Sequence, residues 1–232
     1  MNTRGLFVTG TDTGVGKTWI GVQIAHQLCA RGLPVAPRKT VESGCQERDG
    51  ELVPADGEAY YRAVNARQSL AQITAYRLRH SISPQRAARI EQVDTTLANL
   101  VAATCDAVDT ATFLLVEGAG GFYSPLALDG LNADFAERLQ LPVLLVAPDR
   151  LGVINHVLLS VEAIANRGLH TLAVVLNRLD DSNTLPPGMD NLSDLQSLPC
   201  PVYLMLRDEL LTADHALVHD LIARARREDP HP

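Results

Sequence analysis

The stretch VTGTDTGVGKTW, residues 8–19, constrains the fold of this chain more than any other part of its sequence. It ends in the Gly-Lys-Thr of a phosphate-binding loop. The apolar LFVTG before it and TWIGVQIAHQL after its glycines supply the strand and the helix that such a loop requires. Backbone N–H groups at the start of the helix would hold phosphate, Lys17 would reach the β and γ phosphates, and Thr18 would bind Mg²⁺. The alternative is a glycine-rich turn into a helix, and the strand-loop-helix context argues against it.

The loop departs from the pattern GxxxxGK[ST] at its first position. Thr11 stands where the pattern has glycine, and Gly10 lies one residue too early. This offset indicates a longer variant of the loop, with Thr11 and Asp12 facing the reaction centre. The group that receives phosphate must therefore be sought elsewhere in the chain.

Short apolar runs alternate with longer segments of helical period along the chain. This rhythm predicts a mostly parallel sheet with helices on both faces, a three-layer α/β fold of the P-loop NTPase kind. Ligands bind at the carboxyl ends of the strands in such sheets. We expect strands at 6–10, 34–41, 113–121, 142–147, 172–177 and 201–206, and helices at 17–31, at 153–166 and near the C-terminus. We expect residues 56–109 to be helical with a break at 83–84, and 180–191 to be a loop.

Composition limits the class of protein. A length of 232 residues suits a single α/β domain over 1–232, whose last few residues we expect to be disordered. The net charge of -7 and the dispersed arginines argue against a nucleic-acid partner. The four cysteines contain no CxxC pair, which argues against zinc or redox motifs. No apolar run approaches the roughly 18 residues that span a bilayer, and MNTRG leads straight into a strand. We expect a cytoplasmic protein without a membrane partner.

The lysine count singles out a second candidate site residue. The chain has two lysines, Lys17 and Lys39, against eighteen arginines. A sequence drifting toward arginine should keep lysine where a compact, rotatable ammonium is needed and a planar guanidinium would not fit. Lys39 follows the second predicted strand, so we interpret it as an active-site cation. Chance survival of one surface lysine is the alternative.

Two acids are candidate Mg²⁺ ligands. Glu117 ends the third predicted strand and leads into GAGG, at the same edge of the sheet as the phosphate loop. Asp56 lies at the start of a predicted helix after the second strand. A Mg²⁺ ion that keeps several waters needs only one or two carboxylates plus phosphate oxygens. The alternatives are a surface acid before a turn for Glu117 and a helix N-cap for Asp56.

Four other features of the sequence have both a functional and a purely structural interpretation. Asn177 ends a predicted strand, where its carboxamide could pair with a base edge or belong to a turn. LGVINH, residues 151–156, begins a helix whose free N–H groups could bind a carboxylate, or is an ordinary helix start. His215 and His219 lack the Glu of HExxH, which argues against zinc. Trp19, the only tryptophan, is typical of helix packing.

Taken together, these motifs resemble one family. The chain carries GTDTGVGKT, then RKTVESG, then EGAGG followed by aromatics and Pro125, then LGVINH and VVLN, in this order. It resembles the dethiobiotin synthetases over most of residues 4–205. The resemblance implies a homodimeric P-loop enzyme that closes a ureido ring on 7,8-diaminopelargonate with CO2, ATP and Mg²⁺, in the penultimate step of biotin synthesis. The phosphate acceptor would then be a carbamate, formed when CO2 adds to one substrate amine.

The resemblance also implies roles for individual residues. The catalytic residues would be Lys39, Lys17 and Thr11. Contacts to the substrate would come from Thr11, Ser43, Leu151, Gly152 and Asn155, the last three from the partner subunit. ATP would be bound by Gly14, Val15, Gly16, Lys17, Thr18, Trp19, Asp56, Glu117, Gly118, Ala119, Gly120 and Asn177, with Asn177 on the adenine. Mg²⁺ would be bound by Thr18, Asp56 and Glu117.

The chain departs from the family pattern at several points. Gly14 stands where some members have an acid, Lys39-Thr40-Val41 replaces Lys-Pro-Val, and Gln85 replaces a frequent histidine. After the last strand, YLMLRDEL replaces the glycine and Ile-Pro that usually lead to a loop around the adenine, so the resemblance does not extend to base recognition near 207–209.

Two other functions share this scaffold. A partitioning-type ATPase would carry a further lysine near the start of the phosphate loop, and this loop has none. A cobyrinate amidase-like ligase often has a glutaminase domain, for which no stretch is long enough.

Overall fold

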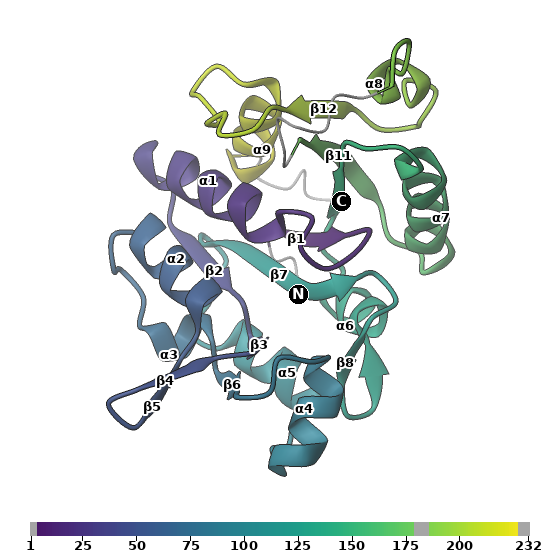
Figure 1. Cartoon of the computed structure of the whole chain (residues 1–232). Coiled ribbons are helices and arrows are strands. Elements are labelled where there is room, and N and C mark those ends of the chain that lie inside the picture. Colours follow the sequence, from purple (N-terminus) through teal and green to yellow (C-terminus); the bar gives the residue numbers. More distant parts are fainter. Residues whose placement is uncertain (1–3, 179–185, 227–232) are drawn as a thin grey trace.

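A six-stranded parallel sheet forms the centre of the protein (Figure 1). The computed structural model describes residues 4–178 and 186–226. In spatial order the strands are β12 (Val202–Met205), β11 (Thr171–Asn177), β10 (Val143–Pro148), β1 (Gly5–Gly10), β7 (Phe113–Gly121) and β2 (Val35–Arg38). The predicted parallel sheet is confirmed. The terminal residues that we expected to be disordered, and 180–185 of the predicted loop, lie outside the described ranges.

The central strand β1 is covered on both faces because its side chains are apolar on both. Leu6 and Val8 pack into the cluster under one helical layer, whereas Phe7 points the other way and meets the ring of Phe135 edge-on, with 5.9 Å between ring centroids. Such a continuous apolar run is typical of a strand buried between two layers. The phosphate loop therefore begins at the carboxyl end of a strand that is buried on both faces.

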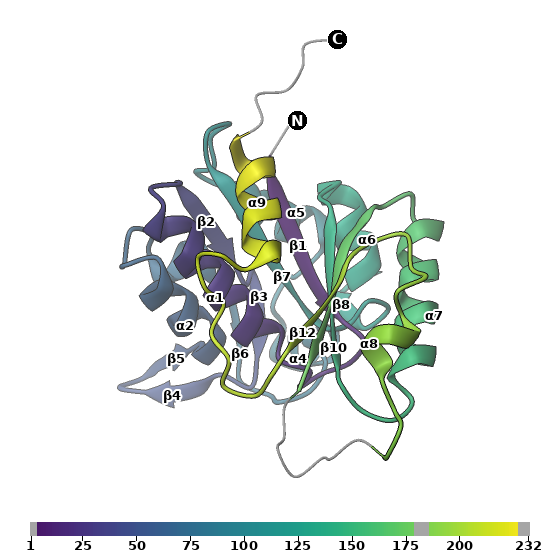
Figure 2. The ribbon, with the colours of Figure 1, turned by 90° about the horizontal axis from the view of Figure 1, so that it is seen from above.

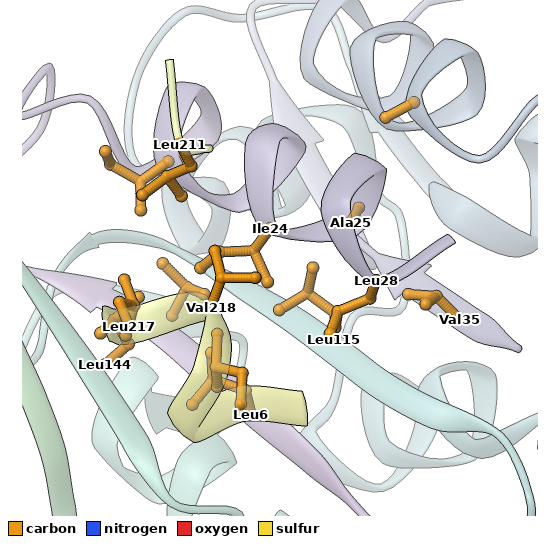
Figure 3. Close-up of a cluster of buried hydrophobic side chains, with 14 of the residues drawn as sticks. Leu6, Ile24, Ala25, Leu28, Val35, Leu115, Leu144, Leu211, Leu217 and Val218 are labelled. Carbon is orange, nitrogen blue, oxygen red and sulfur yellow. The ribbon is translucent and has the colours of Figure 1, made fainter. Parts of the chain in front are cut away.

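Helices cover both faces of the sheet, as predicted (Figure 2). One layer consists of α1 (Lys17–Ala30), α2 (Ala55–Ala63), α3 (Leu70–Ile73) and α9 (Ala216–Arg226). The other consists of α4 (Pro84–Glu91), α5 (Leu97–Cys105), α6 (Asn132–Leu139), α7 (Val153–Asn166) and α8 (Asn191–Asp194). Figure 3 shows the first layer meeting the sheet, where Ile24 and Leu28 of α1 and Val218 of α9 belong to one buried cluster with Leu115 of β7. This packing anchors α1 behind the phosphate loop.

The prediction was wrong for the segment between β2 and β7. Residues 34–41 form two strands, since β3 (Val41–Ser43) leaves the main sheet and pairs in parallel with β6 (Tyr76–Leu78). The strand β6 also interrupts the region predicted to be helical. Pairings of three residues between distant segments leave no periodicity in the sequence. Two further two-stranded sheets were not predicted: β4 (Gln46–Arg48) with β5 (Glu51–Val53), and β8 (Pro125–Ala127) with β9 (Gly130–Leu131).

None of the helices in the described ranges combines the length and the apolar character needed to cross a bilayer.

Candidate active site

A cavity of about 620 Å³ lies at the carboxyl end of the sheet. The phosphate loop forms one wall, and the start of α2, the segment before α4 and the end of β7 form the others. Lys17, Thr18, Lys39, Asp56 and Glu117 all line it. Five candidates from four parts of the sequence therefore meet at the edge of the sheet where ligands of α/β proteins bind.

The phosphate loop folds back closely over the end of β1. A Cβ on Gly10 would lie 2.7 Å from the Val15 side chain, so glycine is needed where the sequence has it, one residue before the usual position. Gly16 has a φ of 92° and leads directly into α1. Among the described residues no side chain caps the start of α1, so its first N–H groups are available to an anion.

Lys17 points back across the loop, where its Nζ donates to the Asp12 carbonyl at 2.8 Å. Burial, followed by the positive charge of Lys39, lowers the pKa of Lys17 to about 8. A phosphate oxygen beside the amine would favour the charged ammonium. The two lysines of the chain are thus close enough to affect each other's charge, as expected if both serve one anionic ligand.

Lys39 lies just after β2 and is buried between two acids. Its Nζ is 2.5 Å from Glu117 Oε1, 3.0 Å from Asp56 Oδ2 and 3.3 Å from the carbonyl of Gly118. Burial alone would lower the pKa of Lys39, but Glu117 and Asp56 together outweigh it and raise the pKa. A buried charge persists only when paired in this way. The prediction that the second lysine belongs to the site agrees with this arrangement.

Glu117 is held from both sides. Its Oε1 accepts from the Thr18 hydroxyl at 2.9 Å, and its Oε2 accepts from the Tyr60 hydroxyl at 2.8 Å. Burial, followed by the charge of Glu117, raises the pKa of Tyr60 well above its usual value, so the phenol stays protonated and donates. Sequence reasoning missed Tyr60, because an aromatic residue four positions after Asp56 is also typical of helix packing.

Thr18, Asp56 and Glu117 offer one hydroxyl and two carboxylates around this point. Within the described part of the chain, no three His, Cys, Asp or Glu side chains gather to hold a metal on their own. Mg²⁺ fits such a set, because it prefers oxygen and usually completes its shell with water and substrate phosphates. These residues therefore suit a cation that arrives with a nucleotide.

Glu42 is the second residue that sequence reasoning missed. Its two carboxylate oxygens accept from the backbone N–H groups of Asp56 and Gly57, both at 3.0 Å, at the start of α2. Burial, followed by the charge of Asp56, raises the pKa of Glu42 to about 7. It lies between Lys39 and Ser43 in a motif that the sequence singled out, so its neighbourhood was the available signal. Its contacts fix the place of Asp56.

The structure brings many of the other predicted residues to the cavity but not all. Gly14, Gly16, Ser43, Ala119 and Gly120 line it. Thr11 does not line it, and its buried hydroxyl has no hydrogen-bond partner among the described residues. Val15 and Gly118 do not line the cavity either. Val15 packs in the hydrophobic core, and a Cβ on Gly118 would clash with the Asn132 side chain.

Two predicted residues and one predicted segment lie away from the cavity. The side-chain amide of Asn177 donates to the Val15 carbonyl at 3.1 Å and so stabilises the conformation of the phosphate loop. Trp19 is 42% exposed and faces a second cavity, between α1, α2 and the segment after β12, instead of packing in the core. Gly152, with a φ of 88°, directly precedes α7. Leu151, just before it, and Asn155, in the first turn of α7, are both exposed. Within one chain, these residues do not meet Lys39.

Comparison with known proteins places this geometry in context. A family described as an AAA domain matches residues 4–219. The ATP-dependent dethiobiotin synthetase BioD of Anaeromyxobacter dehalogenans is 40% identical over 185 residues, which cover 79% of this chain and 81% of that protein. The ATP-dependent dethiobiotin synthetase BioD of Ruthia magnifica is 37% identical over 176 residues, which cover 76% of this chain and 80% of that protein.

Similarity of structure extends further than similarity of sequence. The cell division protein FtsY of Thermotoga maritima is 14% identical, with a TM-score of 0.50 over 97% of this chain and 69% of the other. At this identity the likeness concerns the fold alone. It agrees with the predicted P-loop NTPase architecture.

Proposed function

Because the chain belongs to the dethiobiotin synthetase family, whose members are ATP-dependent ligases, we propose that its cavity holds the triphosphate of ATP at the phosphate loop and a carbamate beside Lys39. The observation that carries this proposal is the position of Lys39, a buried ammonium 2.5 Å from Glu117 and on the same cavity as Lys17. Two cations facing one space suit an anionic acceptor and an anionic donor.

The proposed reaction has three steps. CO2 adds to one amine of 7,8-diaminopelargonate, and a proton leaves the nitrogen to give a carbamate. A carbamate oxygen then takes the γ-phosphoryl group of ATP, which releases ADP. Finally the second amine attacks the carbonyl carbon of this mixed anhydride, loses a proton and expels inorganic phosphate, which closes the ureido ring.

The residues of the cavity would act mainly through charge. Phosphoryl transfer depends on positioning and on stabilisation of negative charge. Lys17 would bind the β and γ phosphates, and Lys39 would stabilise charge on the oxygen shared by carbamate and phosphoryl group. Mg²⁺, held by Thr18, Asp56 and Glu117, would supply positive charge to the phosphate oxygens.

The remaining roles are also proposals. We infer that Ser43 contacts the substrate from the wall of the cavity. The proposed contact between Thr11 and the substrate amines requires the loop to move, because Thr11 does not line the cavity. The backbone from Gly14 to Gly16 would hold phosphates, with Gly118 to Gly120 closing the opposite side. Trp19 would lie beside the nucleotide, and Asn177 would face the base while it braces the Val15 carbonyl. Of these roles, phosphate binding from Gly14 to Gly16 is supported by the uncapped N-terminus of α1, where helices bind anions.

We further propose that the active form is a homodimer, in which the segment at 151–155 of one subunit completes the carboxylate site of the other. Leu151 is 72% exposed, and Leu158 and Leu159 on α7 are 48% and 58% exposed. Exposed apolar side chains that gather on one helix are typical of an interface.

In sedimentation velocity we expect a dimer, and Leu159→Glu should shift it to a monomer with a raised KM for the diamine. Ile90→Glu, at an exposed apolar side chain on α4, is the matched control. A fully active monomeric wild type would contradict the proposal.

Omitting each substrate in turn tests the proposed reaction. We expect ATP-dependent release of inorganic phosphate only when 7,8-diaminopelargonate and bicarbonate are both present, because the acceptor forms only from the diamine and CO2. Without either one, the rate should fall to the background hydrolysis of a P-loop protein. Equal ATP hydrolysis without the diamine would refute the proposed reaction and favour a nucleotide-dependent switch.

A further inference from the structure

We propose that Tyr60 is a positioning residue for this reaction: its hydroxyl holds Glu117 so that one carboxylate oxygen remains turned toward Thr18, and it thereby sets the affinity of the site for Mg²⁺ with nucleotide. The inference rests on the proposed role of Glu117 as a Mg²⁺ ligand. It concerns a residue that does not itself line the cavity.

The two oxygens of Glu117 have separate tasks. Oε1 faces the cavity side, where the Thr18 hydroxyl lies at 2.9 Å and the Lys39 ammonium at 2.5 Å. Oε2 faces α2, where the Tyr60 hydroxyl lies at 2.8 Å. Partners on opposite oxygens fix the rotation of the carboxylate. Only Oε1 is then presented to a cation that Thr18 also binds.

The fold makes room for the Tyr60 hydroxyl. Gly21 of α1 lies directly against it, and a Cβ on Gly21 would be 1.9 Å from the hydroxyl oxygen. The Tyr60 side chain is fully buried, so water does not reach the phenol from outside. A buried hydroxyl needs a partner, and the partner that the described residues provide is Glu117.

The short helix α2 positions both Asp56 and, through Tyr60, Glu117. Asp56 and Tyr60 are four residues apart on α2, which places them on the same face. Asp56 contacts Lys39 directly, whereas Tyr60 acts on Lys39 and Thr18 through Glu117. Glu42 holds the start of the same helix. The orientation of Glu117 is therefore tied to the placement of Asp56.

Removing the hydroxyl would leave Oε2 without this donor and free the carboxylate to turn. Groups that orient a metal ligand typically contribute 10- to 100-fold to metal affinity or activity when they are mutated. We therefore expect Tyr60→Phe to raise the Mg²⁺ concentration for half-maximal turnover by at least about 10-fold. Because saturating Mg²⁺ can restore the ligand, kcat should change less.

The test compares Tyr60→Phe with Tyr61→Phe. Tyr61 is the next residue on α2, is 37% exposed, and has no hydroxyl partner among the described residues, so it controls for the same chemical change. For each protein we would titrate turnover with Mg²⁺. We would also measure the rise in Tm given by ADP with Mg²⁺ and by ADP with EDTA. The Tm measurement needs neither the diamine nor turnover, so it remains informative if the proposed reaction is wrong.

A positioning role and a packing role predict different results. Positioning predicts that Tyr60→Phe loses most of the Mg²⁺-dependent part of the ADP shift while keeping the part seen in EDTA, and that Tyr61→Phe keeps both. A packing role predicts an unchanged Mg²⁺ dependence, since phenylalanine retains the ring, and this result would overturn the proposal. If Tyr60→Phe does not fold, Gly21→Ala tests the same contact with the hydroxyl present, because the added methyl displaces it from Glu117. An unaltered Mg²⁺ dependence in folded Gly21→Ala would equally overturn it.

Discussion

Replacing Lys39 by arginine is expected to lower kcat by at least about 100-fold, although the charge is kept. The ammonium is buried and has three acceptors within 3.3 Å, at Glu117, Asp56 and the Gly118 carbonyl. A guanidinium is planar and carries its donors in a fixed fork, so it cannot occupy this space and also turn toward a carbamate. Steady-state kinetics at saturating ATP, diamine and bicarbonate measure the effect.

The control for this substitution is the reverse exchange at an exposed position. Arg86→Lys changes an exposed side chain on α4 and should leave kcat and Tm as in the wild type. Near-normal kcat in Lys39→Arg would show that positive charge alone suffices. It would also show that the lysine count is not a guide to function in this chain.

Replacing Glu117 by glutamine is expected to lower kcat/KM for ATP by roughly 100- to 1,000-fold, because Glu117 would hold the Mg²⁺ that stabilises the transferring phosphoryl group, and the loss of one such stabilising interaction typically has this effect. The amide keeps the shape but removes the anion that pairs with Lys39 and accepts from Thr18 and Tyr60. We also expect a loss of about 2 kcal/mol in the free energy of unfolding, since hydrogen bonds to charged groups contribute about 1.5 to 3 kcal/mol. In a chain of this size such a loss lowers Tm by about 4 to 8 °C.

Kinetics and thermal unfolding check the two parts of this prediction separately. Glu51→Gln, at an exposed end of β5, is the matched control and should change neither quantity. A Glu117→Gln variant with wild-type kcat/KM but lowered Tm would assign Glu117 to stability and would remove it from the proposed Mg²⁺ site.

The sequence predicted the parts of the fold and site that leave a local pattern. The glycines and Lys17 of the phosphate loop, the apolar runs and Glu117 at the end of one of them all have neighbours in sequence that reveal their context. Lys39 was identified from composition, and the structure places it between the two acids that were chosen on other grounds. Independent signals in the sequence thus chose residues that the fold brings to one cavity, while their roles stay predictions.

The residues that were missed act through long-range contacts. Tyr60 reaches Glu117 across 57 positions of the chain, and only the packing of α2 against α1 and β2 brings the two side chains together. The pairing of β3 with β6 likewise depends on two segments of three residues each. Asn177 illustrates a different limit, because its position was predicted from a strand end while its amide contact with the Val15 carbonyl depends on the folded loop. Tertiary contacts of this kind decide such details, and local propensity does not.

The exposed ring of Trp19 gives the protein an intrinsic optical reporter. All indole fluorescence of the chain comes from this one side chain, because there is no other tryptophan. It directly follows Thr18, yet it faces the second cavity and is 42% exposed to solvent. Its emission therefore originates within one residue of the phosphate loop and requires no separation from other indoles. Events at the loop could be followed in real time on the unmodified protein, without a label that would disturb the loop itself.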